Sequence, residues 1–150
     1  TVVLSKIAGE ALSYLQRMAD AAAVKLSLND QSNGAEWQAD KGALFTLLKN
    51  LIENAIQHAP AGTEVLLTLS PDSLTVRDFG PGVTEDELPQ LFNRFWRGAH
   101  RLDSGAGLGL AICQEIAVTH HWILSAQRVE PGLQFTLSND PQYFNSKLVS

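Results

Sequence analysis

The segment from residue 41 to residue 58 most constrains the fold, because its apolar residues recur at the three- and four-residue spacing of a helix. Those apolar residues are Leu44, Leu47, Leu48, Leu51, Ile52, Ala55 and Ile56. Asp40 is a residue type that caps helix starts, and Pro60 with Gly62 is expected to end the helix near Ala59. The pattern predicts one amphipathic helix whose apolar face covers a core.

The same segment carries polar side chains on a different face. At about 100° per residue, this polar stripe consists of Asn50, Asn54, Gln57 and His58. Two carboxamides one turn apart, beside an imidazole, are able to bind a polar ligand. The ordinary explanation of such a stripe is a solvated helix surface, so other segments of the chain must decide between the two readings.

Further helices and short strands are predicted on both sides of this segment. Helices are expected from about Ser5 to Ala23, over a short stretch that starts at Thr84 with Glu87 completing a capping box, and from about Leu108 to His120. Extended segments are expected at Lys25–Asn29, Glu36–Ala39, Glu64–Ser70, Ser73–Asp78, Ile123–Val129 and Gln134–Leu137. The mixture predicts an α+β fold: a two-layer α/β sandwich whose mixed, mostly antiparallel sheet is covered on one face by about three helices.

Composition limits the classes of function. The 150 residues fit one domain with a substantial core, and the formal charge of -5 argues against general nucleic-acid binding. A local basic patch is formed by Arg94, Arg97, His100 and Arg101. The single cysteine, Cys113, excludes an intramolecular disulfide and fits a reducing compartment. No apolar run approaches the ~20 residues needed to span a bilayer.

Two glycine-containing segments are candidate binding loops. Gly105-Ala106-Gly107-Leu108-Gly109 precedes a helical pattern, where backbone N–H groups and the helix dipole favour a phosphate. It is neither a dinucleotide fingerprint nor a Walker loop, and a flexible loop would also explain it. Asp78-Phe79-Gly80-Pro81-Gly82 ends a predicted strand. It is either a tight turn capped by Asp78, or a carboxylate placed to accept from an exocyclic amine beside a flat ring.

A third candidate places aromatic side chains between two arginines. Phe92, Phe95 and Trp96 are expected to pack in the core or at the hinge of the following loop. Arg97 can reach a phosphate, although an exposed solvated arginine is the default for any single one.

Taken in order, these motifs resemble the N, G1, F and G2 boxes of sensor histidine kinases, within the ATPase/kinase superfamily of DNA gyrase and the mismatch-repair ATPases. The matching residues are Asn50 and Asn54, then Asp78-x-Gly80-x-Gly82, then Phe92-x-x-Phe95, then Gly105-x-Gly107-x-Gly109. The resemblance runs from about residue 40 to residue 137. It implies a histidine-kinase-type ATP-binding domain over residues 1–140, and residues 141–150 are a tail without an assigned role.

The resemblance implies specific roles for these residues. Asn54 would ligate Mg²⁺, Asn50 would lie beside the triphosphate, and Asp78 would accept from the adenine N6 amine. Asn50, Asn54 and Arg97 form the implied catalytic group. Residues 97–105 would form a mobile lid over ATP. The implied nucleotide contacts also include Gln57, His58, Gly80, Gly82, Phe95, Gly105, Gly107, Leu108 and Gly109.

The chain departs from the commonest family pattern at a few positions. Gln57 stands where the family often has a phosphate-facing lysine, and Arg97 or Arg94 is expected to compensate. His120-His121-Trp122 replaces a frequent His-Gly-Gly, which puts the tight turn there in doubt. ATPases of the superfamily generally carry glutamate at the position of Asn50, and a carboxamide cannot act as a general base. Asn50 therefore favours phosphoryl transfer over hydrolysis, although the neighbouring Glu53 complicates this inference.

The resemblance further implies the partners. The phosphoryl acceptor would be a histidine on a dimerisation domain of the same full-length protein, which would in turn phosphorylate a response regulator. None of His58, His100, His120 and His121 stands in an acceptor-like sequence, so we expect this chain to be the catalytic half, monomeric and unable to phosphorylate itself. The full-length protein would be a homodimer anchored in a bacterial inner membrane, with this domain in the cytoplasm.

Two alternatives remain open at this point. One is a non-catalytic nucleotide-sensing or docking module, in which the boxes serve only the structure. The other is an ATPase or serine kinase of the same superfamily.

Overall fold

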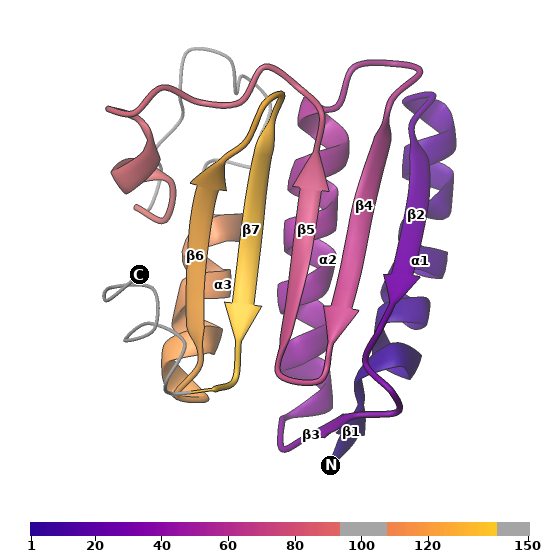
Figure 1. The fold of residues 1–150 in the computed structure, drawn as a ribbon, viewed down its shortest axis with the longest axis vertical. Helices are drawn as coiled ribbons and strands as arrows, with labels where there is room; N and C mark the ends of the chain where they lie inside the picture. Colours follow the sequence, from indigo (N-terminus) through magenta and orange to yellow (C-terminus); the bar gives the residue numbers. More distant parts are fainter. Residues whose placement is uncertain (94–107, 141–150) are drawn as a thin grey trace.

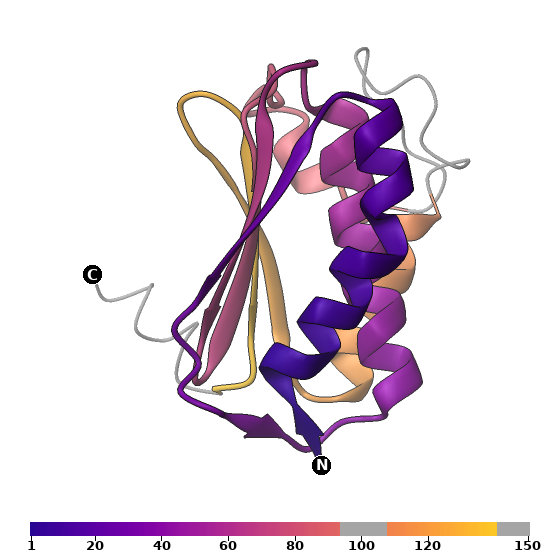
Figure 2. The same cartoon turned by 90° about the vertical axis from the view of Figure 1, so that its right-hand side faces the viewer.

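The computed structural model describes residues 1–93 and 108–140, and all structural statements below concern these residues. In this part of the chain, three α-helices lie on one face of a five-stranded sheet (Figures 1 and 2). The helices are α1 (Leu4–Ala21), α2 (Lys41–His58) and α3 (Gly109–Thr119). The sheet is formed by β2 (Lys25–Asp30), β4 (Glu64–Ser70), β5 (Ser73–Asp78), β6 (Ile123–Arg128) and β7 (Leu133–Ser138).

The sheet has the order β2-β4-β5-β7-β6, and only the β2–β4 pair is parallel. Strands β4 and β5, both predicted as extended segments, form a hairpin with Ser70 opposite Ser73 and Val65 opposite Asp78. Alternate residues of both strands are buried beneath the helices, which leaves the other face of the sheet without a helical cover (Figure 2). The α+β prediction of a mixed, mostly antiparallel sheet under three helices is therefore confirmed.

Helix α2 is the central helix of its layer (Figure 1). It starts as predicted, because the Asp40 carboxylate accepts a hydrogen bond from the N–H of Ala43 at 2.9 Å. Every apolar residue of the predicted face is buried. The helix ends before Pro60, which cannot continue a helix.

The turn after α3 forms despite the absence of glycine. His121 takes a left-handed conformation with φ of 61°, and the N–H of Trp122 donates to the carbonyl of Ala117 at 2.8 Å. The ring of Trp122 stacks on His120 and meets Trp37 edge to face. His120 Nε2 in turn accepts from the Asp40 N–H at 3.2 Å, so the end of α3 is tied to the start of α2.

The short helix predicted from Thr84 is only partly correct. The capping box exists, since Thr84 N–H donates to Glu87 Oε1 at 3.0 Å and Glu87 N–H donates to Thr84 Oγ1 at 3.2 Å. The following residues form a turn and the 3₁₀ helix η1 (Leu88–Gln90) rather than an α-helix. Pro89 explains the difference, because it lacks an N–H and disfavours the α conformation at the residue before it.

Two very short strands lie at the end of the molecule opposite the C-terminal end of β5 (Figure 1). They are β1 (Val2–Val3) and β3 (Glu36–Trp37), which pair antiparallel. The extended segment expected near residue 36 is confirmed as β3, whereas β1 was not predicted. Among the described residues, no helix is both long enough and apolar enough to cross a membrane.

Candidate functional site

The polar stripe of α2 divides into three environments. Asn54 is buried, with 8% of its surface exposed. Asn50 and His58 are half-buried, while Gln57 is exposed to solvent. Although these residues share one face of the helix, the stripe contains one buried carboxamide, Asn54, between two half-buried side chains.

Asn50 lies against the first residue of α3. A Cβ placed on Gly109 would make an ordinary van der Waals contact, 3.8 Å from Cγ of Asn50, so the start of α3 lies beside the asparagine amide. Leu108 precedes this glycine as the N-cap residue and is half-buried. Asn50 and Gly109 are therefore adjacent, with Leu108 next to them in the chain.

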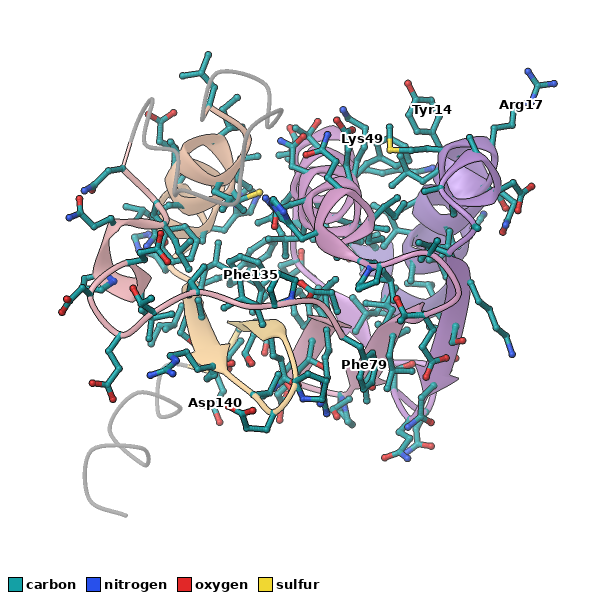
Figure 3. The ribbon with its side chains drawn as sticks, turned by 90° about the horizontal axis from the view of Figure 1, so that it is seen from above. Tyr14, Arg17, Lys49, Phe79, Phe135 and Asp140 are labelled. Atoms are coloured by element: carbon teal, nitrogen blue, oxygen red, sulfur yellow. The ribbon has the colours of Figure 1, made fainter. Side chains whose placement is uncertain are left out.

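Glu53 forms an ion pair with Lys49 on the same helix, at 3.6 Å. Both side chains are about one-third exposed, and Lys49 lies on the side of α2 away from the sheet (Figure 3). Glu53 is therefore engaged on the outer surface of the helix layer.

Cys113 fills the contact between α3 and α2. Its Sγ lies 3.5 Å from the carbonyl oxygen of Leu47. Burial raises the pKa of the thiol to about 12, against smaller opposing effects from Asn50 and Lys49. The thiol is consequently neutral at physiological pH and acts as a small apolar side chain beside Asn50.

Asp78 ends β5 as a buried carboxylate, with 2% of its surface exposed. Because it alternates with Arg77, it lies on the helix-covered side of the sheet, as Val76 does. Its Oδ1 accepts a hydrogen bond from the N–H of Gly80 at 2.9 Å. Asp78 therefore caps the turn that follows β5, and this bond helps to orient its carboxylate.

Three glycines form a cradle around Asp78, into which no side chain fits. A Cβ on Gly80 would collide with the carbonyl of His58, at the end of α2. A Cβ on Gly82, where φ is +72°, would lie 2.8 Å from the carbonyl oxygen of Gly132. A Cβ on Gly132, where φ is +110°, would collide with the main chain of Asp78. The end of α2, the end of β5 and the β6–β7 turn thus approach each other through main-chain atoms.

Gly132 was not among the predicted site residues. Its local sequence, Pro131-Gly132 between two strand patterns, indicates only a turn. Its proximity to Asp78 arises from the pairing of β5 with β7, in which Arg77 lies opposite Gln134. A sequence pattern confined to short segments cannot reveal this contact.

Several predicted residues lie outside the described part of the chain. They are Phe95, Arg97, Gly105 and Gly107, together with the lid at residues 97–105 and the tail at residues 141–150. Phe92, the first aromatic of the F box, is described, and its ring meets Phe135 of β7 edge to face at 5.9 Å. Phe135 lies between the sheet and the helices, so Phe92 contributes to the core, as expected (Figure 3).

The comparisons with known proteins agree with this arrangement. The family model described as "Histidine kinase-, DNA gyrase B-, and HSP90-like ATPase" matches residues 39–142. Sensor protein QseC of Escherichia coli O157:H7 is 38% identical over 109 residues, which are 73% of this chain and 24% of QseC. Sensor-like histidine kinase SenX3 of Mycolicibacterium smegmatis is 32% identical over an alignment 150 residues long. That alignment covers 95% of this chain and 38% of SenX3. The chain therefore spans well under half the length of these curated relatives.

Solved structures show the same fold. The mycobacterial sensor histidine kinase MprB superposes with a TM-score of 0.78 at 25% identity, covering 91% of this chain and 94% of that chain. Full-length ShkA in complex with AMPPNP superposes with a TM-score of 0.80 at 26% identity, covering 93% of this chain and 30% of that chain. From the family match, the relatives and the shared fold, the chain belongs to the family of histidine kinase-, DNA gyrase B- and HSP90-like ATPases, as an ATPase domain of the kind found in sensor histidine kinases.

Proposed function

We propose that this domain binds Mg·ATP beside α2 and donates the γ-phosphoryl group to a histidine on a separate dimerisation domain. The observation that carries the proposal is the glycine cradle around Asp78, located beyond the end of the helix that presents Asn50 and Asn54. The names of the relatives and the AMPPNP in the ShkA structure support the same reading.

The described residues fit a nucleotide. An adenine base needs an acceptor for its exocyclic amine, which the Asp78 carboxylate offers, and the three glycines let main-chain segments pack closely around that carboxylate. Asn54 offers an amide oxygen, and magnesium in proteins takes one or two such oxygens beside phosphates and waters. Bound magnesium would neutralise charge on the phosphates. In the proposed roles, Asp78 selects adenine, Gly80 and Gly82 shape the adenine pocket by letting main-chain segments approach Asp78, and Asn54 ligates the metal.

Asn50 is proposed to position the phosphates without activating water. A carboxamide is not a base, and the nearby carboxylate of Glu53 is paired with Lys49. The domain would therefore hold ATP for transfer and hydrolyse it slowly. His58, Gln57, Leu108 and Gly109 are proposed as further nucleotide contacts, with Phe95, Arg97, Gly105 and Gly107 added on the family resemblance alone.

The partners are part of the proposal. The acceptor histidine would lie on a dimerisation domain of the same full-length protein, and a response regulator would receive the phosphoryl group next. We further propose that residues 1–140 are the catalytic domain of a homodimeric protein anchored in a bacterial membrane.

Replacement of Asn54 tests nucleotide binding. Asn54→Ala is expected to weaken magnesium-dependent binding of a fluorescent ATP analogue by at least about tenfold, because it removes the proposed metal ligand. Gln16→Ala, which changes an exposed amide on α1 that bonds Asp20, is the matched control and should bind nearly as wild type does. Equal affinity of wild type and Asn54→Ala, with and without magnesium, would instead favour a docking module whose boxes serve only the structure.

A further inference from the structure

Arg77 connects the uncovered face of the sheet to the β6–β7 turn. It alternates along β5 with the buried Val76 and Asp78, so its side chain leaves the sheet on the side opposite the helices. Its Nη2 donates to the carbonyl oxygens of Pro131 at 3.1 Å and Glu130 at 3.4 Å. These two carbonyls belong to the residues that immediately precede Gly132 in the chain.

The same guanidinium lies over the ring of Phe79, with its Cζ 4.2 Å from the ring centroid. Phe79 lies on the sheet side of the molecule, away from the helices (Figure 3). Because Phe79 stands between Asp78 and Gly80, Arg77 contacts both the segment that carries the candidate base acceptor and the turn that packs against it. The Arg77 side chain thus contacts both the segment after β5 and the β6–β7 turn, from the face of the sheet opposite the helices.

The β6–β7 turn packs against the end of β5 through main-chain atoms. Gly132 touches the main chain of Asp78 and lies close to Gly82, but these contacts contain no side chain from Gly132 that could anchor the turn. Within the turn, the Val129 N–H donates to the Gly132 carbonyl at 3.2 Å. Any shift of the turn would therefore change the space beside the Asp78 carboxylate directly.

We propose that Arg77 is a positioning residue for adenine selection. It binds the carbonyls of Glu130 and Pro131 and stacks on Phe79. These contacts hold Gly132 against Asp78 and keep the Asp78 carboxylate in a fixed position relative to the three glycines. The proposal rests on the proposed function, in which Asp78 accepts from the adenine amine. Arginine suits this role better than lysine, because its planar fork can bond main-chain carbonyls while its face covers an aromatic ring.

The Kd values for ATP and GTP, measured for wild type and for Arg77 variants, test this positioning role. Arg77→Met keeps most of the apolar length of the side chain but removes the donors and the charge. It is expected to raise the Kd for ATP about fivefold, as the loss of charge-assisted hydrogen bonds predicts, while the Kd for GTP stays unchanged. Arg77→Lys, which keeps the charge without the fork, should lie between wild type and Arg77→Met.

Arg128→Met is the matched control. Arg128 is an arginine of the neighbouring turn region whose ion pair with Glu85, at 3.4 Å, is solvent-exposed. Its replacement removes the same charge without touching Phe79 or the two carbonyls, so ATP and GTP binding should remain as in wild type.

Amide hydrogen exchange tests the role of Arg77 without any nucleotide. In the nucleotide-free protein, Arg77→Met should accelerate exchange of the Val129 amide by about tenfold relative to wild type, since the turn opens more often. An unchanged Val129 rate, or equal weakening of ATP and GTP binding, overturns the role of Arg77. If wild type binds no nucleotide, the proposed function fails, and the Val129 rate alone then decides whether Arg77 holds the turn.

Discussion

Asn50 and Asn54 lie one turn apart on α2, yet only Asn54 is fully enclosed. Their common direction follows from the 3.6-residue period, which sequence reasoning captures. Their different burial depends on the segments that pack against α2, such as the start of α3, where Gly109 abuts Asn50. At the scale of single residues, the sequence thus identified the polar stripe but not the enclosure of each member.

Gly132→Ala tests whether the cradle requires the absence of a side chain. The new Cβ would collide with the main chain of Asp78 at a φ of +110°, so we expect the free energy of unfolding to fall by about 3 kcal/mol or more. Urea denaturation measures the change. Gly62→Ala is the control, because Gly62 also has a positive φ but has no atom within 4 Å of the added Cβ. It should cost only about 1 kcal/mol, and equal losses for the two variants would contradict the packing described for Gly132.

Cys113 makes stability depend on alkaline pH. Its thiol has an ordinary pKa of 9.0, which burial in the folded state raises to about 12. Between these values the unfolded chain loses the proton while the folded chain keeps it, so stability is fully present below pH 9 and falls as pH rises toward 12. In this range the Cys113 thiol lowers the free energy of unfolding by up to about 1.4 kcal/mol per pH unit.

Cys113→Ala removes this contribution. Unfolding free energies measured from pH 8 to pH 11 should therefore fall less steeply for Cys113→Ala than for wild type, whatever constant difference separates the two proteins. Parallel curves would show that the thiol is not protected in the folded state.

At the scale of elements, helix and strand positions were predictable wherever a long periodic pattern was bounded by a cap or a breaker. Helix α2, between Asp40 and Pro60, is the clearest case. The prediction of a helix after Thr84 was only partly correct. The capping box is present, but Pro89 leads to a 3₁₀ helix in place of an α-helix. Strand β1 contains only two residues and exists through its pairing with β3, so no local pattern could indicate it.

The turn after α3 permits a stabilising change. His121 is an exposed non-glycine residue with φ of 61°, a conformation that costs L-residues about 1 kcal/mol. His121→Gly should raise the free energy of unfolding by about that amount in thermal or chemical denaturation. His121→Ala removes the imidazole but keeps the Cβ, and should bring no comparable gain. A loss of stability in His121→Gly would mean that the imidazole makes contacts that outweigh the backbone strain.

At the scale of the whole molecule, the candidate site is assembled around α2. Asn50 meets the start of α3, His58 meets the turn after β5, and the β6–β7 turn closes against Asp78. Through their resemblance to the boxes of sensor histidine kinases, the sequence motifs predict that α2, the end of β5 and the start of α3 serve one site. The part played by Gly132 and Arg77 was not predictable, because it depends on strand pairing and on main-chain carbonyls that carry no sequence signature.

Phosphoryl donation to a histidine on another domain is the activity proposed for this chain. The most direct measurement mixes this chain with γ-labelled ATP, magnesium and a separately purified, histidine-bearing dimerisation domain of a matching sensor kinase. We expect acid-labile label on the dimerisation domain, no stable label on this chain alone, and no transfer by Asn54→Ala. Stable label retained on this chain without the second domain, or release of phosphate to water with no labelled histidine, would contradict it.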